Sequence, residues 1–450
     1  MTASNVSEPE ISGPLRWFRG GGTAMVASTA FSIGTKALQA IASFATVHRL
    51  VELWGQAGYG LWVTLTAFAL YISLFDMGVG YGVKNRVSEA WGRGNLDDAS
   101  ATVRAGMALY AVAASIALVF GVLVVGLVAP FKDHMVAAGI LWFACVVAFF
   151  LSYQNTLLQG LARFKGLALL SLIAPVTWFA LIRCWPRGAA LPLELGAAVY
   201  SAALVLQGLA TWLVSRRAHG FRIAAWHRTR PVELRPLLRT GVQFLVLQLA
   251  AFVLNGSGTF LVYRSLGGAE TAQYDAANKV FSIFTVAFST LIAIAWTEIS
   301  RAKAAHNHRR LANVHRLLYA VVGAFSLVVA AVCYSSAPLT HALTGISVPT
   351  HASIAFAAFV VVQMAAFASA VFLNAFERLR VQIIVALLAI PAFFIVALGL
   401  LSAGWGMPSI PIASAIAMLP SLVVCHVVAR RLIWHAGGNT VRIVAFQDNG

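Results

Sequence analysis

The sequence predicts an all-α membrane protein with 12 transmembrane helices, arranged in two pseudo-symmetric six-helix bundles with a central cavity between them. Three observations lead to this prediction: the composition, the length of the apolar segments, and an internal repeat. Of the 450 residues, 60% are hydrophobic and only 10% are charged. Soluble proteins carry about 25% charged residues. So few charges cannot cover a surface in water, and the chain must therefore use lipid as part of its solvent.

Apolar segments of spanning length recur along the whole chain. A spanning helix needs about 20 predominantly apolar residues, whereas a membrane barrel would need alternating strands of about 10 residues, which do not occur here. The twelve predicted helices cover residues 23–47, 58–82, 101–129, 135–158, 167–185, 193–214, 241–263, 272–297, 317–337, 352–376, 381–403 and 408–428.

A basic hinge between apolar runs occurs twice. Residues 157–175, LLQGLARFKGLALLSLIAP, contain Arg163, and residues 372–391, FLNAFERLRVQIIVALLAIP, contain Arg378, 215 residues later. The same offset pairs Arg49 with Arg264, Ala57 with Ala272, Tyr59 with Tyr274, and Arg216 with Arg431. A single offset over such a distance indicates a duplicated unit. We therefore predict an N-terminal tail (1–22), a first bundle (23–214), a basic connector (215–240), a second bundle (241–433) and a C-terminal tail (434–450).

The basic residues are distributed unevenly between the two sides of the predicted membrane. When the loops are assigned alternately, 25 of the 32 Lys and Arg lie on the side of the N-terminus. Short loops rich in Lys and Arg face the cytoplasm, which places both termini there. The net charge of +17 then reflects topology, and no soluble basic domain is left to bind nucleic acid. The Arg-rich connector is either a plain tether or a docking site for anionic lipid headgroups.

Two predicted helices contain lysines at membrane depth. Lys36 lies near the middle of the first helix, where an ammonium costs about 2.5–3.5 kcal/mol. It must therefore line a transport path or form a structural ion pair. Asp275 and Lys279 are four residues apart in the eighth helix. They are either a neutralised ion pair or, together with Asn278, part of a polar face on a water-filled cavity.

Other polar residues also fall inside predicted helices. Asp76, near the cytoplasmic end of the second helix, is either a coupling carboxylate or a helix-end residue paired with Lys84 or Arg86. Asn255 interrupts the apolar run of the seventh helix, as is tolerated beside a cavity. Arg49 and Arg264 either snorkel to headgroups or contact substrate. We predict Lys36, Lys279, Asn255, Arg49 and Arg264 as substrate-binding residues, and Asp76 and Asp275 as ion-coupling residues.

These residues concentrate in the first, second, seventh and eighth helices, which are the first pairs of the two halves. Transporters built from repeats place their substrate path at the repeat interface. The sequence contains no GxSxG, HExxH or Walker motif, so we expect neither an enzyme nor a cofactor. His306, His308 and His315 are assigned to a basic loop with no carboxylate or cysteine cluster, and we expect no metal site. The four cysteines lie in apolar runs at unrelated spacings, typical of small hydrophobic residues.

Four motifs, in this order and spacing, resemble those of a known family. They are FDMGVGYGVKNRVSEA followed by GRGNLDDA, the hinge LLQGLARFK, the helix end TEISRAKA, and the hinge LNAFERLR. With twelve helices in two sixes, the chain resembles the MOP (multidrug/oligosaccharidyl-lipid/polysaccharide) exporter superfamily, and in particular its Wzx-like polysaccharide branch. Trp296 and Thr297 stand where the family usually has a proline near the end of the eighth helix.

The resemblance implies a flippase that moves a polyprenyl-diphosphate-linked oligosaccharide across the bacterial inner membrane by ion-coupled alternating access. It also implies a central cavity lined by the first, second, seventh and eighth helices, cationic in this branch, where Lys36 and Lys279 would fit. The expected partners are the lipid-linked substrate, membrane lipids, and a polysaccharide polymerase and glycosyltransferases.

Two other functions remain open from the sequence. A MATE-like exporter of drugs or cations would favour a cavity lined by carboxylates, which disagrees with Lys36. A membrane polysaccharide polymerase or ligase would need a sizeable outer loop, whereas the predicted outer loops are short.

Overall fold

The computed structural model describes residues 21–76, 78–92, 95–161, 163–186, 188–218, 231–304, 307–376 and 378–447. These residues form helices joined by turns, with no strand among them. The first half contains α2 (Gly21–Leu70), the 3-10 helix η1 (Tyr71–Asp76), α3 (Val79–Gly92), α4 (Leu96–Leu127), η2 (Lys132–His134), α5 (Met135–Gly160), α6 (Phe164–Leu170), α7 (Ile173–Cys184) and α8 (Leu193–Ala218). The second half contains α9 (Pro231–Leu266), α10 (Gly268–Ala304), α11 (His308–Tyr334), α12 (Ser336–Thr344), α13 (Thr350–Ala375), α14 (Leu379–Ser402) and α15 (Ser409–Gln447).

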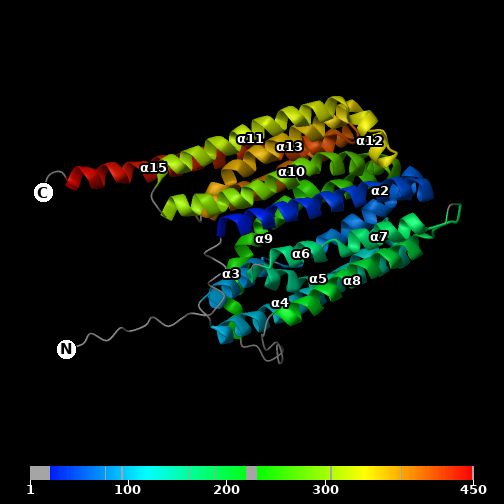
Figure 1. The fold of residues 1–450 in the computed structure, drawn as a ribbon. Helices are drawn as coiled ribbons and strands as arrows, with labels where there is room; N and C mark the ends of the chain where they lie inside the picture. The colour runs from blue at the N-terminus through cyan, green and yellow to red at the C-terminus, as the bar shows by residue number, and fades with distance from the viewer. Residues whose placement is uncertain are drawn as a thin grey trace.

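The helices form two groups that lie side by side (Figure 1). One group contains α3 to α8 and the other contains α10 to α15, while α2 runs between them and contacts both α7 and α10. We call the end of the molecule that carries α12 the distal end, and the end where α15 stops the proximal end. Ten described helices are long and apolar enough to cross a membrane. The fold is therefore the predicted helical membrane fold, although the count of twelve spans is not confirmed.

Local structure departs from the predicted segments in three places. The second predicted helix is broken, because α2 gives way to η1 and then to a turn at Gly78, whose φ of 69° is open to glycine. The fifth predicted helix consists of two helices, α6 and α7. In the second half, the distal connection after α11 contains the additional helix α12, which the sequence analysis treated as a loop.

Backbone landmarks recur between the two halves. Arg163 and Arg378 precede helices with φ of −87° and −92°, and each backbone N–H donates to the carbonyl five residues earlier at 2.8 Å. Their separation is the 215 residues read from the sequence. The positive-φ elbows Gly55 and Gly267, however, are 212 residues apart, as are the helix-capping residues Asn95 and Asn307.

The two offsets show where the halves differ in length. The second half has three more residues than the first between its capping asparagine and the start of α13, the stretch that contains α12. The residue pairs that we predicted before this point, such as Tyr59 with Tyr274, are consequently three positions out of register with the elbows. The boundaries of the two bundles stay a prediction. Residues 219–230 of the connector and residues 1–20 of the N-terminal tail lie outside the described residues, and the predicted C-terminal tail is helical to Gln447.

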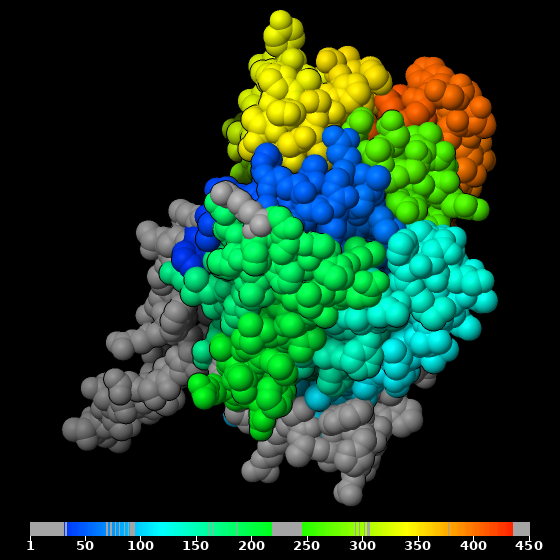
Figure 2. Space-filling view, turned by 90° about the vertical axis from the view of Figure 1, so that its right-hand side faces the viewer, coloured from blue at the N-terminus to red at the C-terminus, as the bar shows by residue number. Residues whose placement is uncertain are grey.

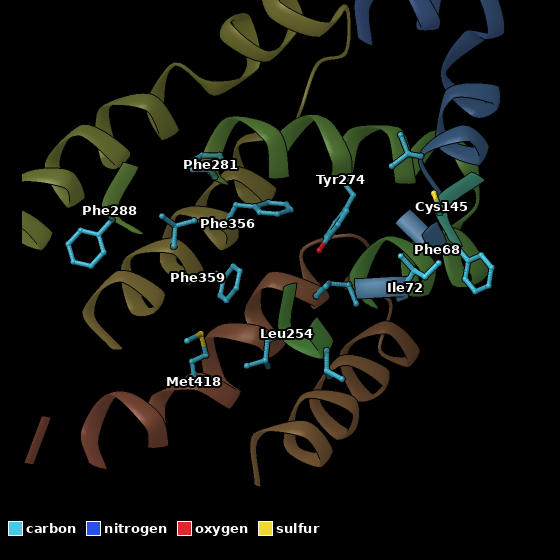
Figure 3. Packing of buried hydrophobic residues seen from close by; sticks show 14 of the residues in the cluster. Phe68, Ile72, Cys145, Leu254, Tyr274, Phe281, Phe288, Phe356, Phe359 and Met418 are labelled. Carbon is cyan, nitrogen blue, oxygen red and sulfur yellow. The ribbon is translucent and has the colours of Figure 1, made fainter. Parts of the chain in front are cut away.

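Aromatic side chains fill the interior of each half. In the first half Phe68 stacks on Trp142 with ring centroids 4.4 Å apart. Trp142 occupies the space over Gly121, where a Cβ would lie 1.6 Å from its Nε1 atom. In the second half Phe356 packs between Tyr274 and Phe281 (Figure 3). Large buried rings on several helices hold each group together by apolar contact.

We predict that reporter fusions at positions 94, 220 and 308 report a cytoplasmic location, and that fusions at positions 132 and 188 report an external one. The reason is the concentration of Lys and Arg on one side of the predicted membrane. The measurement is paired alkaline phosphatase and green fluorescent protein activity for each fusion. Cytoplasmic signals at both 132 and 188 would contradict the predicted orientation.

Candidate functional site

The two halves meet at the distal end through the backbones of α2 and α10. A positive-φ glycine precedes each contact: Gly55 is a kink inside α2 at which two helical segments meet, and Gly267 lies directly before α10. These two elbows bring the chain segments together at the distal end. A Cβ on Gly60 would lie 1.8 Å from the Gly268 carbonyl oxygen, and a Cβ on Gly268 would lie 2.4 Å from the carbonyl oxygen of Ala57. The halves can therefore approach this closely only because both positions are glycine.

Figure 2 looks at this distal surface, where α2 (blue) lies against the region of α12 (yellow). His48 of α2 supports the same contact, since a Cβ on Gly345, at the end of α12, would lie 3.1 Å from its Nδ1 atom. The distal ends of the two halves are thus packed against each other in this conformation.

A polar cluster formed by Tyr59, Asp275 and Lys279 lies on this contact. The Tyr59 hydroxyl donates to Asp275 Oδ2 at 2.5 Å, and Lys279 Nζ donates to the Tyr59 hydroxyl at 3.2 Å. Lys279 also forms the predicted ion pair with Asp275. Tyr59 belongs to the first half, whereas the two charged residues belong to the second. The cluster therefore connects the halves through hydrogen bonds to charged groups, which are the stronger kind.

The members of this cluster differ in their accessibility. Tyr59 is 2% exposed, and the side chain of Asp275 is 10% exposed. The side chain of Lys279 is 27% exposed, so its ammonium can be reached while the carboxylate stays covered. An anion from outside the cluster can therefore reach the Lys279 ammonium and replace the covered Asp275 carboxylate as its partner.

Asn255 is the polar side chain at the centre of the broken apolar run of α9. It is exposed, donates to the Ala251 carbonyl at 2.7 Å, and accepts a hydrogen bond from Gln363 of α13 at 2.8 Å. Asn255 and Lys279 are each 12 residues from Gly267, which is about 18 Å along their helices at a rise of 1.5 Å per residue. These two predicted substrate residues therefore lie at similar depth, on neighbouring helices.

Asp76 lies where the second predicted helix breaks. Its carboxylate accepts a hydrogen bond from the Gly80 N–H at 2.9 Å, and further hydrogen bonds from Tyr110 of α4 and Gln248 of α9. The bond to Gly80 is a helix-capping interaction. The predicted alternative, an ion pair of Asp76 with Lys84 or Arg86, is not found among the ion pairs of the described residues. Asp76 thus joins the halves through a neutral residue of α9.

Lys36 is exposed on α2, and a nearby residue, Gln39, donates to the Ser171 hydroxyl of the first half at 2.8 Å. The helix rise puts Lys36 about 28 Å from the elbow at Gly55, which is deeper toward the proximal end than Lys279. Arg49 pairs with Glu52 at 2.7 Å and donates to the Trp185 carbonyl at 3.1 Å. These contacts hold Arg49 within the first half.

Arg264 is exposed in the last turn of α9. The structure therefore brings Asp275 and Lys279 together and puts Asn255 at a similar depth. It places the other predicted residues elsewhere, with Asp76 toward the proximal end and the two arginines near the distal end.

Several residues of these clusters were not predicted. Tyr59 was noted only as a repeat position, and Gln363, Tyr110 and Gln248 gave no signal, since single polar residues in apolar runs are common. The assignment of His308 and His315 to a loop was wrong, because both belong to α11. His306, which was assigned to the same loop, lies outside the described residues. Among the described residues, no group of three or more His, Cys, Asp or Glu could hold a metal ion.

An apolar pocket of about 500 Å³ lies between the halves on the side of η1, α4 and α9. Its lining includes Phe75 from η1, Phe120 from α4, and Leu245 and Phe260 from α9. All the lining side chains are apolar or aromatic. Leu245 precedes Gln248 by one helical turn, so the pocket lies beside the break at Asp76.

An inward-facing multidrug resistance MATE transporter of the MOP superfamily superimposes with a TM-score of 0.66 at 15% identity, covering 88% of this chain and 95% of that one. The outward-facing conformation of such a transporter gives 0.61 at 14% identity, covering 92% and 96%. A MOP superfamily transporter from Pyrococcus furiosus, described as having a binding pocket of reverse polarity, gives 0.62 at 15% identity, covering 92% and 96%. At these identities the likeness concerns the fold.

A search of curated proteins found no significant match to the sequence. The family model described as "Polysaccharide biosynthesis protein" matches residues 25–297, which is more than half of the chain and includes the elbows, the distal contact and the cluster of Tyr59, Asp275 and Lys279. The chain has a helical membrane fold similar to that of MOP superfamily transporters. The match of the family model over more than half of its length shows that the chain belongs to the polysaccharide biosynthesis protein family.

Proposed function

We propose that this transporter flips a polyprenyl-diphosphate-linked oligosaccharide across the bacterial inner membrane by alternating access. The observation that carries the proposal is the cluster of Tyr59, Asp275 and Lys279, because it puts an approachable cation on the contact between the halves. A diphosphate or an acidic sugar is an anion that Lys279 would attract. The family description, which concerns polysaccharide biosynthesis, supports a glycan as the cargo.

The cluster suggests how the substrate drives the change of conformation. An anion bound to Lys279 competes for its ammonium with Asp275 and with the Tyr59 hydroxyl, so the hydrogen bond from Lys279 to Tyr59 across the contact is lost. A hydrogen bond to a charged group contributes about 1.5–3 kcal/mol, so losing it favours separation of the distal ends. A ligand shifts such an equilibrium only through different affinities for the two states. The competition for Lys279 supplies that difference.

The closed distal contact supports an inward-facing state, in which the substrate enters from the cytoplasmic side. The higher TM-score with the inward-facing MATE structure agrees with this assignment. In this orientation both termini are cytoplasmic and the distal end faces outward. We place a glycosyltransferase upstream, because the lipid-linked sugar must be made before it is moved, and a polymerase downstream.

The lipid part of the substrate needs apolar surroundings while the sugar crosses. The pocket between η1, α4 and α9 offers such surroundings at the edge between the halves, and its aromatic lining suits a hydrocarbon chain. Asp76 lies beside this pocket, and we propose it, with Asp275, as a site of ion coupling. Lys36, Asn255, Arg49 and Arg264 remain proposed substrate contacts, of which Asn255 and Lys36 are best placed along the path.

Export of cationic drugs is the second candidate, since several of the similar structures are multidrug transporters. Their likeness extends to the fold alone, and the approachable group on the distal contact of this chain is a cation. A cationic drug would be repelled there, whereas an anionic lipid-linked sugar would be attracted.

We predict that Lys279→Gln lowers glycan export at least about tenfold, because it removes the cation while keeping a polar side chain of similar length. A tenfold loss corresponds to about 1.4 kcal/mol. The measurement is surface polysaccharide in a deletion strain complemented with each variant at matched membrane abundance. Lys132→Gln, at an exposed lysine outside the long helices, is the matched control and should export normally. Normal export by Lys279→Gln would rule out the proposed anion contact.

We predict that Tyr59→Phe opens the distal end more often, because the variant keeps the ring and loses the bond to Asp275. Thr271→Cys in a Cys184→Ser background reports opening, since Thr271 is fully buried near the contact and Cys184 is the exposed native cysteine. A membrane-impermeant thiol reagent should modify position 271 roughly tenfold faster in the Tyr59→Phe variant, as expected for the loss of about 1.5 kcal/mol. Tyr334→Phe, at an exposed tyrosine, should leave the rate unchanged. Equal modification rates in the Thr271→Cys protein, its Tyr59→Phe variant and its Tyr334→Phe variant would show that the bond between Tyr59 and Asp275 does not hold the distal ends together.

We predict that Lys36→Gln keeps the fold and loses glycan export, and that Lys36→Arg keeps part of it because the cation remains with different geometry. The same complementation assay measures both variants. Normal export by Lys36→Gln would show that this lysine is outside the substrate path.

A further inference from the structure

We propose that His315, Tyr319, Ser369 and His426, called here the histidine cluster, bind the proton that is exchanged for substrate during transport. The cluster joins α11, α13 and α15 within the second half and is separate from the cluster of Tyr59, Asp275 and Lys279. The inference rests on the proposed alternating-access function and adds the identity of the coupling ion.

The cluster is a chain of hydrogen bonds between three helices. His426 Nδ1 of α15 is 3.0 Å from the Tyr319 hydroxyl of α11. The same hydroxyl is 2.8 Å from Ser369 Oγ and 3.2 Å from the Ala365 carbonyl, both on α13. The His315 ring lies 4.9 Å from the Tyr319 ring and 5.3 Å from the His426 ring, measured between centroids. Both histidines therefore meet around one hydroxyl.

This chain can accept a proton without losing a hydrogen bond. With neutral His426, Tyr319 can donate to Nδ1 while Ser369 donates to Tyr319. With protonated His426, Nδ1–H donates to Tyr319, whose own proton then turns to the Ala365 carbonyl or to Ser369. Each hydroxyl both donates and accepts, so the direction of the chain reverses and every polar group stays bonded.

His315 contributes an unpartnered nitrogen at the same place. The residue is 9% exposed, and its Nε2 atom is buried with no hydrogen-bond partner among the described residues. A buried unsatisfied polar atom costs about 1–3 kcal/mol, and few are found in native proteins. Tyr319 and His426 are only partly buried, so the cluster is not fully enclosed by the packed helices.

The charged groups around the cluster set the direction of its response. Arg430 lies one turn after His426 on α15, and its positive charge repels a positive charge on either histidine ring. Glu298 of α10 is paired with Arg310 of α11 at 2.5 Å, and within the described part of the chain no carboxylate acts on either ring. Among the described residues, further ionisable side chains toward this end of the packed helices are Lys303 of α10, which donates to the Ala375 carbonyl at 3.1 Å, His308, Arg309 and Arg316 of α11, Arg378 and Arg380 at the start of α14, and Cys425 and Arg431 of α15.

A proton added to the histidine cluster therefore places a second positive charge near Arg430 in a largely buried site. Neutral His315 and His426 rings therefore favour the conformation with the distal end closed, and a positive charge on either ring disfavours it. Acidification should shift the protein away from this conformation. In the transport cycle, the inward-facing state would release its proton to the cytoplasm, as coupling of export to proton entry requires.

The test uses the full chain, purified and placed in phospholipid nanodiscs without substrate. Spin labels on Arg163→Cys and Arg378→Cys, in a Cys184→Ser background, report the distance between the proximal hinges of the two halves, which are both exposed. Pulsed electron resonance measures this distance between pH 8 and pH 5.5. We expect the population with the shorter distance to rise as pH falls, because opening the distal end brings the proximal ends together.

His315→Gln combined with His426→Gln should abolish this pH dependence. His308→Gln, an exposed histidine on the same helix, is the matched control and should keep it. Tyr319→Phe retains the ring packing and breaks the hydrogen-bond chain, so it should move the midpoint of the transition even if the double variant fails to fold. A purely structural role for the cluster would leave the pH profile of Tyr319→Phe unchanged.

Either of two results would overturn the proposal: a distance distribution in the unmodified protein that does not change with pH, or the same pH dependence in the histidine variants. Because no substrate is present, these results are independent of the glycan export assays. A failure of export with an intact pH response would count against the proposed cargo only, whereas normal export without a pH response would count against the proton site only.

Discussion

The contact between Gly60 of α2 and the backbone of α10 is the constraint on which the arrangement of the two halves depends. Any side chain at Gly60 would have to occupy the position of the Gly268 carbonyl. The two elbows, at Gly55 and Gly267, need the positive φ that glycine adopts without strain. These glycines let the backbones touch, and the touching backbones bring Tyr59 within hydrogen-bond distance of Asp275. A side chain at either contact position would separate the halves and break the polar bond as well.

Polar groups inside a membrane protein must find partners within the protein, because lipid offers none. Among the described contacts between helices that satisfy this requirement are those of Tyr59 with Asp275, Asn255 with Gln363, and Asp76 with Gln248. The first and third of these join different halves. The bond between Tyr59 and Asp275 lies at the distal end, and the bond between Asp76 and Gln248 lies toward the proximal end. Separating the halves at either end therefore breaks the hydrogen bond at that end. The halves are thus linked by a few specific bonds over a largely apolar interface, as the proposed alternating access requires.

The fold class could be predicted from the sequence because a lipid environment determines both the composition and the length of the apolar segments. Neither feature depends on which residues meet in the folded protein. The ion pair of Asp275 and Lys279 was also predictable, since residues four apart meet on one helix face. The partner Tyr59 was not, because its contact crosses 216 positions of the chain. The break at Gly78 was missed for a related reason. Single-residue breaks leave the apolar pattern intact, and the helix was read as continuous. His315 was assigned to a loop because the first turns of α11 are basic, and the apolar segment used for the prediction begins only after them.

The register of the two halves gives the distal contact its asymmetry. At the spacing set by the elbows, Asp275 and Lys279 of α10 correspond to Val63 and Ala67 of α2, and Tyr59 corresponds to Thr271. The charged pair therefore occurs on one side of the contact, and the hydroxyl that bonds to it occurs on the other. A fully symmetric contact would place two lysines and two carboxylates against each other, so each lysine could pair with a carboxylate of either half. With the pair in one half only, Lys279 has Asp275 as its carboxylate partner in the described cluster, and an anion that binds Lys279 has to displace that one carboxylate.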